Sequence, residues 1–305
     1  MSKKLVAITG GGLQRDLGDF EALKFIKSIG ADGVDFSLMS RINDYRNPDS
    51  IYSKSDDEII DYYTKLKKHA DDLGLAICHT HGRLDGFYDD EEENEAQNKN
   101  ARIDCLITSI LKAPVCVIHG VNSIKMGIEC EPQRMRDLNF EMFNKFLVHA
   151  KKYNIQIATE TFGDALLWDE CDFFGNMDEF LKSYNRIAAV GDNKKYFSVC
   201  MDTGHTNKAS RYRNNPTPGD AIRMLGDKIS VLHLHDNDTF TDQHKIPMTG
   251  CIDWNDVFDA LDEIGFEGYY NLELFLHHFG QNFKKETAEF AIKVMRNMLD
   301  TRYGA

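Results

Sequence analysis

The sequence predicts an α/β fold, a (β/α)8 TIM barrel in a single domain, and three observations carry this prediction. Eight short, β-branched apolar segments recur along the 305-residue chain, and they are nearly continuous in apolar residues, as parallel strands buried on both faces are. Longer segments of helical periodicity separate them, and eight such strand–helix units can close into a barrel. No linker or shift in composition divides the chain, so we expect one domain over residues 1–305.

The predicted elements follow one another at regular spacing. The strands are residues 5–9, 33–38, 75–79, 114–119, 155–161, 197–202, 229–235 and 269–274. The clearest helical periods cover residues 56–73, 135–153 and 284–299. Gly74 and Gly265 stand where helices should end before the third and eighth strands, a usual position for a left-handed residue. The acidic run 89–93 is typical of a solvated helix start.

A doubly wound, dinucleotide-binding sheet is the competing fold. Its marker would be the glycines Gly10, Gly11 and Gly12 after the first strand, but they lack the GxGxxG spacing. Asp35 is the one acidic residue near the end of the second strand that could bind a ribose. We therefore interpret the glycines as a flexible loop over the barrel mouth.

Composition narrows the class of partner. The formal net charge is −13, without a basic patch, and such a field repels nucleic acid and anionic membranes. No apolar run approaches the ~18 residues of a membrane span, and the apolar stretch at the N-terminus is too short for a signal peptide. The seven cysteines show no CxxC spacing and mostly lie in apolar segments, so we expect buried thiols in a reducing cytoplasm.

Residue types that bind metal ions end six successive predicted strands, the third to the eighth. Functional groups of a parallel barrel lie at these C-terminal ends and in the loops that follow. Buried carboxylates are costly unless paired or bound to a cation, so their convergence on one barrel mouth predicts a divalent metal ion. Carboxylate and imidazole groups suit Mn²⁺, Zn²⁺, Co²⁺ or Mg²⁺ without choosing among them. The residues are His79, His81, His119, Glu160, Asp202, His205, His233, His235 and Glu273, and His244 follows the seventh strand.

These segments resemble the xylose isomerase-like barrel superfamily, which includes sugar and sugar-phosphate isomerases and epimerases, inosose dehydratases and apurinic-site endonucleases. The resemblance runs over essentially the whole chain, one motif per strand, and its most specific parts are Met201-Asp202-Thr203-Gly204-His205, His233-Leu234-His235-Asp236-Asn237, Asp242-Gln243-His244 and Ile252-Asp253-Trp254. It implies one metal ion held by Glu160, Asp202, His233 and Glu273. His233 is preferred to His235 because it precedes a Leu-x-Asp pattern, and His235 then faces substrate or stands behind the ligands.

The endonuclease branch of the superfamily has further ligands for a metal cluster. The matching positions, which are candidates for a second metal ion, are His81, His119, His205, Asp242 and His244. In the sugar-handling branch the same positions bind hydroxyl groups or nothing. We favour that interpretation because DNA cleavage needs phosphate-neutralising Lys and Arg. Met248-Thr249-Gly250-Cys251 replaces the usual Pro-Gly-x-Gly turn, which leaves the roles of Asp242 and His244 open.

The resemblance implies a metal-dependent isomerase or epimerase of a sugar or sugar phosphate. A proton leaves a carbon next to a carbonyl, a metal ion stabilises the enediolate, and a proton returns. Glu160 and Glu273 are the expected acid and base. Alternatives are a hydride shift, an inosose-dehydratase-like lyase and, less favoured, an endonuclease or a catalytically inactive sugar-binding barrel.

The predicted partner is a small-molecule sugar or sugar phosphate, and the chain is a candidate homo-oligomer. The loop 236–250 is long enough to cover the site. Arg83 is a further candidate for a phosphate or sugar oxygen, and Phe162 for an apolar wall beside the sugar. The expected substrate-binding residues are His205, His235, His81, Trp168 and Lys245.

Overall fold

Eight parallel strands form one sheet that curves into a barrel. The computed structural model describes residues 3–39, 43–165 and 168–304. The sheet order is β7-β6-β5-β4-β3-β2-β1-β8, and β7 meets β8 through Leu234, whose N–H donates to Asn271 O at 2.8 Å. The strands are β1 (Leu5–Thr9), β2 (Gly33–Ser37), β3 (Ala76–His81), β4 (Val115–Ile118), β5 (Gln156–Glu160), β6 (Phe197–Asp202), β7 (Ile229–His233) and β8 (Tyr269–Leu272). The result is a single α/β domain with a nearly closed TIM barrel, as the sequence predicts.

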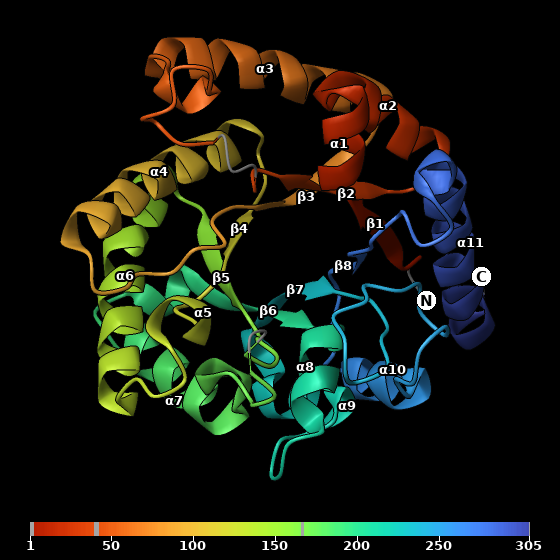
Figure 1. Ribbon diagram of the computed structural model, residues 1–305. Coiled ribbons are helices and arrows are strands. Elements are labelled where there is room, and N and C mark those ends of the chain that lie inside the picture. The colour runs from red at the N-terminus through yellow and green to blue at the C-terminus, as the bar shows by residue number, and fades with distance from the viewer. Residues whose placement is uncertain (1–2, 40–42, 166–167, 305) are drawn as a thin grey trace.

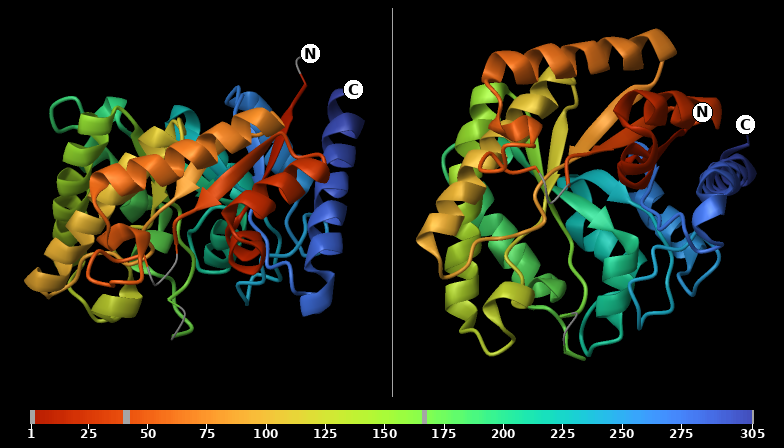
Figure 2. Two further views of the ribbon diagram at one scale, coloured as in Figure 1. Left: turned by 90° about the horizontal axis from the view of Figure 1, so that it is seen from above. Right: turned by 45° about the horizontal axis from the view of Figure 1, so that its top comes forward.

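Helices surround the strands on the outside of the barrel (Figures 1 and 2). They are α1 (Gly11–Leu17), α2 (Asp19–Ser28), α3 (Asp56–Leu73), α4 (Glu91–Ile110), α5 (Ser123–Met126), α6 (Pro132–Tyr153), α7 (Met177–Ala188), α8 (Thr203–Ser210), α9 (Pro218–Leu225), α10 (Trp254–Glu263) and α11 (Lys284–Tyr303). The described residues also contain five short 3₁₀ helices: η1 (Ile51–Ser53), η2 (Phe173–Gly175), η3 (Asn193–Lys195), η4 (Gly226–Lys228) and η5 (Gln281–Phe283).

Helix α3 illustrates how local sequence sets these boundaries. Ser55 and Glu58 form a capping box at its start, which satisfies backbone N–H groups that have no partner within the helix. The helix ends at Gly74, which adopts the left-handed conformation (φ 64°). Four side chains at helical spacing are buried against the sheet: Ile59, Tyr63, Leu66 and Ala70. Likewise, α4 begins after Asp90, whose carboxylate accepts from Glu93 N–H at 3.0 Å, so the acidic run is a helix start as expected.

The barrel interior has an apolar floor with a polar layer above it. Small apolar side chains from four adjacent strands form the floor: Val115, Val117, Ala158, Cys200 and Val231. Residues two apart in a strand point to the same side. The side chains of Glu160, Asp202 and His233 therefore point into the barrel. Each lies two residues beyond a floor residue of the same strand, which is Ala158, Cys200 or Val231 respectively. This alternation places the predicted polar residues inside the barrel mouth rather than among the helices.

The structure corrects one expectation about an element and adjusts several boundaries. Gly11 and Gly12 belong to helix α1 rather than to a flexible loop. Predicted strand ends differ from the observed ones by up to two residues, so His119, Thr161, His235 and Glu273 lie just beyond their strands and His81 lies within β3. All seven cysteines are free, and four of them are buried. None of the helices in the described ranges is both long and apolar enough to cross a membrane.

Candidate metal centre

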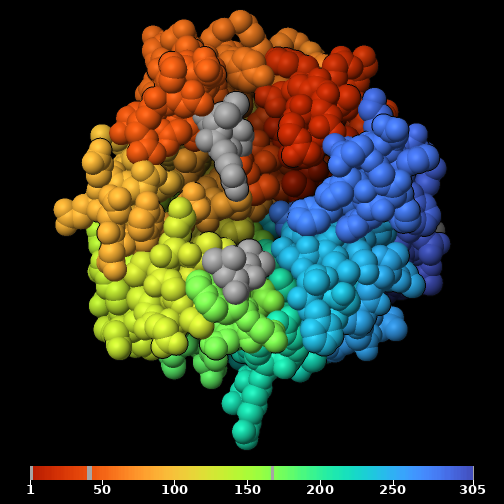
Figure 3. Space-filling model, in the orientation of Figure 1, coloured from red at the N-terminus to blue at the C-terminus, as the bar shows by residue number. Residues whose placement is uncertain are grey.

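The predicted site residues gather at the end of the barrel onto which Figure 1 looks. The C-terminal ends of β3 to β8 and the loops after them lie there, and their metal-binding side chains come within reach of one another. The space-filling view of this face is hollowed between the red N-terminal and blue C-terminal segments (Figure 3). The convergence follows from strand parity and from the parallel order of the sheet, as it does in other barrels of this type.

Four residues from four neighbouring strands form the central cluster, which consists of Glu160, Asp202, His233 and Glu273. Each offers one ligand atom, and the four atoms all lie within 4.8 Å of one another. His233 Nδ1 is 3.2 Å from Glu160 Oε1 and 3.4 Å from Glu273 Oε2. Glu273 is the most exposed of the four at 8%. The structure therefore brings together the four residues predicted to share one ion.

The electrostatics of the central cluster fit a divalent cation. Burial alone would raise the pKa of Glu160, but the His233 and His119 imidazoles hold that pKa well below its ordinary value. Burial likewise opposes ionisation of Glu273, and His233 lowers its pKa well below the usual range. Among the described residues, the buried Oε2 atom of Glu273 has no hydrogen-bond partner, and that of Glu160 faces only imidazole nitrogens. Three buried carboxylates with unused lone pairs beside one imidazole are a donor set that Zn²⁺ or Mn²⁺ accepts.

Two histidines extend the central cluster on the β3–β4 side. His119 Nε2 lies 3.0 Å and His81 Nε2 lies 3.3 Å from Glu160 Oε2. His81, Glu160 and His233 also offer ligand atoms within 4.8 Å of one another. Glu160 is therefore shared between the central cluster and these two imidazoles.

A second cluster lies on the other side of Asp202 and consists of His205, His235, Asp242 and His244. His235 Nε2 is 3.0 Å from Asp202 Oδ1, and its ring stacks on His244 with centroids 3.8 Å apart. His244 Nε2 is 3.2 Å and His205 Nε2 is 3.8 Å from Asp242 Oδ2. The structure thus separates two neighbouring histidines, with His233 in the central cluster and His235 in the second.

The second cluster is shaped by the charges of its carboxylates and by an uncommon backbone conformation at His244. Burial would lower the pKa of His205, but Asp202 and Asp242 raise it well above its ordinary value. For His244, the hydrogen bond to Asp242 and the charge of Glu273 outweigh burial and raise the pKa to about 9. His244 has a φ of +44°, an uncommon conformation for a residue with a Cβ. The loop therefore holds this imidazole at some conformational cost.

Asp236 organises the loop that carries Asp242 and His244. Its buried carboxylate accepts from the backbone N–H of Asn237, Met248 and Ile252 and from Trp254 Nε1 at 2.9–3.1 Å. Gly250 is required here, because a Cβ on it would lie 2.3 Å from Asp236 Oδ1. The motif Ile252-Asp253-Trp254 thus closes the loop onto the strand end.

Other predicted site residues lie around these clusters. Lys245 pairs through its backbone with Asp236, and its ammonium makes no hydrogen bond or ion pair within the described ranges. Trp168 is half-buried in the loop after β5. The Phe162 ring lies between His119 and His205, with centroids 6.0 and 5.8 Å away.

Arg83 does not fit its suggested role as a substrate cation. Its Nε donates to the buried carboxylate of Asp104 at 2.9 Å, and its guanidinium also donates to Asn43 O at 2.5 Å. Tyr52 donates to the same carboxylate from its hydroxyl group. Arg83 is therefore part of a buried network that fixes the loop after β3.

Sequence reasoning gave Asp35 no place in the site and named His79 only as one of the metal-binding residue types at the strand ends. The side chains of Asp35 and His79 lie below the central cluster, and together with His233 they offer ligand atoms within 4.8 Å of one another. The available signal was that Asp35 is an acidic residue in a buried strand, and it was considered only as a ribose ligand.

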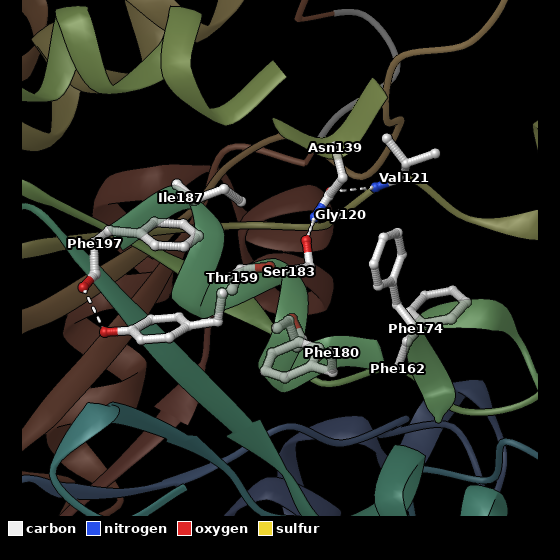
Figure 4. Close-up of a pocket in the computed structure, with 12 residues that line it drawn as sticks. Gly120, Val121, Asn139, Thr159, Phe162, Phe174, Phe180, Ser183, Ile187 and Phe197 are labelled. Atoms are coloured by element: carbon white, nitrogen blue, oxygen red, sulfur yellow. Dashed lines mark hydrogen bonds between the residues drawn. The ribbon is translucent and has the colours of Figure 1, made fainter. Parts of the chain in front are cut away.

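A small cavity of about 10 Å³ lies beside Glu160, outside the barrel mouth. Phe162, Phe174 and Phe180 line it, and Asn139 Nδ2 donates to Ser183 Oγ at 2.6 Å at its polar edge (Figure 4). Its volume suits about one water molecule and not a sugar.

Comparisons with known proteins agree with this architecture. Crystal structures of a D-tagatose 3-epimerase-like protein (TM-score 0.68, 17% identity, 98% of this chain and 99% of that one) and of the IOLI protein with a binding zinc atom (0.72, 15%, 99% and 100%) are similar. So is D-psicose 3-epimerase with D-tagatose from Clostridium cellulolyticum H10 (0.72, 14%, 97% and 99%). These low identities speak for the fold alone.

The sequence relatives match only about half of this chain. The uncharacterized protein y4fM of Sinorhizobium fredii is 27% identical over 174 residues, which is 56% of this chain and 50% of the relative. The uncharacterized protein MJ1311 of Methanocaldococcus jannaschii is 28% identical over 138 residues, 45% and 43% respectively. The matches thus span about half the length of these relatives. A family model described as xylose isomerase-like TIM barrel matches residues 23–298, and the chain therefore belongs to the xylose isomerase-like TIM barrel family.

Proposed function

We propose that this protein is a divalent-metal-dependent isomerase or epimerase that moves a proton next to the carbonyl group of a sugar or sugar phosphate. One observation carries the proposal: three carboxylates and one imidazole are buried within 4.8 Å of one another at the barrel mouth. The similarity to epimerase structures, one of them containing D-tagatose, supports the choice of a sugar.

Glu160, Asp202, His233 and Glu273 would hold the ion. When bound, a divalent metal ion supplies Lewis-acid polarisation of a carbonyl and orients the neighbouring hydroxyl. The mixture of three carboxylates and one imidazole admits Mn²⁺, Zn²⁺, Co²⁺ or Mg²⁺.

Glu160 and Glu273 are the proposed proton-transfer pair. His233 Nδ1 lies between them, at 3.2 and 3.4 Å. Glu160 is the more enclosed and is surrounded by His119, His205 and His233, which keep it ionised and able to accept a proton. Glu273 has 10% of its side chain exposed and can exchange a proton with water, as the group that returns a proton must.

The surrounding residues bind the substrate in this proposal. His81 and the second cluster present imidazoles to sugar hydroxyl groups, and the Lys245 ammonium offers a charge for a phosphate. Trp168 and Phe162 supply apolar surface for the face of the sugar. The second cluster also has the composition of an ion site, so the number of bound ions separates a one-metal from a two-metal enzyme.

The test combines metal analysis with a substrate screen. We expect at least one divalent ion per purified chain, and deuterium exchange from solvent into a ketose or ketose phosphate. Glu160→Gln and Glu273→Gln should each reduce turnover by about 10²–10⁴-fold, the usual contribution of a proton-transfer group. Glu141→Gln, at an exposed position on α6, is the matched control and should behave as wild type.

Three results would contradict the proposal. Wild-type turnover in either glutamine variant would remove the proton-transfer pair. A new enone absorbance with loss of water would assign the chain to the lyases instead. Cleavage of an abasic-site duplex at low salt would assign it to the endonucleases.

A further inference from the structure

Asp35 is a buried carboxylate in the middle of β2, close to His233 of the central cluster. It is 0% exposed, and its Oδ2 accepts a hydrogen bond from Thr9 Oγ1 at 2.8 Å. Thr9 is held in turn by Asn271 Nδ2, 3.4 Å from its hydroxyl oxygen. Residues of β1 and β8 therefore fix this carboxylate in place, although none of them neutralises its charge.

The two ring nitrogens of His233 face different groups. Nδ1 faces Glu160 and Glu273, so it is the nitrogen available to an ion in the central cluster. Nε2 points the other way, toward Asp35 Oδ2 at 3.8 Å, and it is buried without a hydrogen-bond partner. A small rotation of the ring would convert this approach into a hydrogen bond.

His79 occupies the other side of the carboxylate. Its Nε2 is 3.5 Å from Asp35 Oδ1, and both atoms are buried without a hydrogen-bond partner. The rings of His79 and His233 lie 5.5 Å apart, with Asp35 reaching both. An arrangement with this many unpartnered buried polar atoms is costly unless another state of the protein uses them.

We propose that Asp35 is a positioning residue for the metal centre, accepting a hydrogen bond from Nε2–H of His233 while Nδ1 of the same ring holds the ion. This inference rests on the proposed metal function. Histidines that bind metals generally donate their second N–H to a carboxylate, carbonyl or water, which fixes the tautomer and increases ligand basicity. Asp35 supplies that carboxylate, and Thr9 orients it.

A second ion between Asp35, His79 and His233 is the competing explanation. That site would contain a single carboxylate, so a dication would leave uncompensated positive charge in the interior. It would also require His233 to bind ions through both ring nitrogens, with neither protonated. One carboxylate shared by two N–H donors needs neither condition.

The test measures metal binding in Asp35→Asn, which keeps the shape of the side chain and removes its charge. Chelator competition should show about 10- to 100-fold weaker affinity than wild type, the usual effect of losing such a partner. The visible absorption bands of the Co²⁺-loaded protein should also shift, because the donor strength of His233 changes. Thr9→Val removes only the hydroxyl that orients Asp35 and should weaken affinity by a smaller factor.

Asp172→Asn is the matched control, since Asp172 is also fully buried but contacts none of the clustered residues. Its affinity and Co²⁺ spectrum should equal those of wild type. Wild-type affinity and spectrum in Asp35→Asn would overturn the inference while leaving the proposed function intact, whereas a wild-type protein that binds no divalent ion overturns both. Loss of one ion from two would make Asp35 a ligand and also overturn the inference. Should Asp35→Asn fail to fold, Thr9→Val decides between the same outcomes.

Discussion

Asp172 shows how a single buried carboxyl group ties stability to pH. Its two oxygens accept from the backbone N–H of Ser123 and Phe174, at 2.7 and 3.0 Å. Burial outweighs these bonds and raises its pKa from 3.8 to about 6. The folded protein therefore keeps a proton that the unfolded chain has already lost between about pH 4 and 6. The resulting stability is complete below about pH 4 and falls, by up to about 3 kcal/mol, as the pH rises through 6.

Urea unfolding of wild type and Asp172→Asn at several pH values between 4 and 7 measures this contribution. The asparagine cannot ionise, so the difference in unfolding free energy between the two proteins should change across the window. Parallel curves would show that Asp172 ionises in the folded state as readily as in the unfolded chain.

The positions of residues were predictable where strand position alone decides them. Glu160, Asp202, His233 and Glu273 each end a strand or follow one directly, so parity and the parallel order of the sheet suffice to bring them together. Arg83 was different, because Asp104 lies 21 residues further along, in α4. The packing of α4 decides which buried carboxylate pairs with Arg83, and no local sequence pattern predicts that packing.

At the scale of elements, the loop between β7 and α10 depends on Asp236. Removing its carboxylate leaves three backbone N–H groups and one indole N–H without their acceptor, so Asp236→Ala should loosen the loop and release Asp242 and His244. Hydrogen exchange should accelerate at Met248 and Ile252, while amides of β5 and β6 keep their rates.

Asp238→Ala is the control within the same loop. Asp238 is exposed and, among the residues that the structure describes, accepts only from Phe240 and Thr241, so faster exchange should stay confined to those residues. Equal exchange at Ile252 in wild type and Asp236→Ala would show that the loop is held by its other contacts.

Helices and strands were predictable from the sequence where their hydrophobic pattern is long or continuous. Short helices were harder to predict. All eight strands were identified, since burial on both faces leaves an apolar run. Helix α1 was missed because glycine disfavours helices and three adjacent glycines indicate a loop. Packing explains Gly11, because a Cβ on it would lie 3.1 Å from Ser37 Oγ, whereas a Cβ on Gly12 would have no neighbour within 4 Å. Helix α8 escaped notice because its start is set by Asp202, whose carboxylate accepts from His205 N–H at 2.6 Å.

At the scale of the whole molecule, the central cluster spans the weakest seam of the barrel. Strands β7 and β8 share one isolated bridge, between Leu234 and Leu272, whereas the other neighbouring strands pair over two to five residues. His233 and Glu273 lie on opposite sides of that seam. An ion bound by both residues would link β7 to β8, and it would also offset part of the −13 net charge.

Metal binding should therefore stabilise the entire fold and not only the site. At an ion concentration about 100 times the Kd, the gain is about 2.7 kcal/mol, which corresponds to roughly 5 °C in Tm for a domain of this size. Calorimetry of the chelator-treated protein, with and without added Mn²⁺ or Zn²⁺, measures the shift. Hydrogen exchange should slow at residues 232–236 and 270–274 in particular, because these flank the seam. Glu273→Gln should lose most of the thermal shift and Glu141→Gln none, whereas a shift that persists in Glu273→Gln would place the stabilising ion away from the β7–β8 seam.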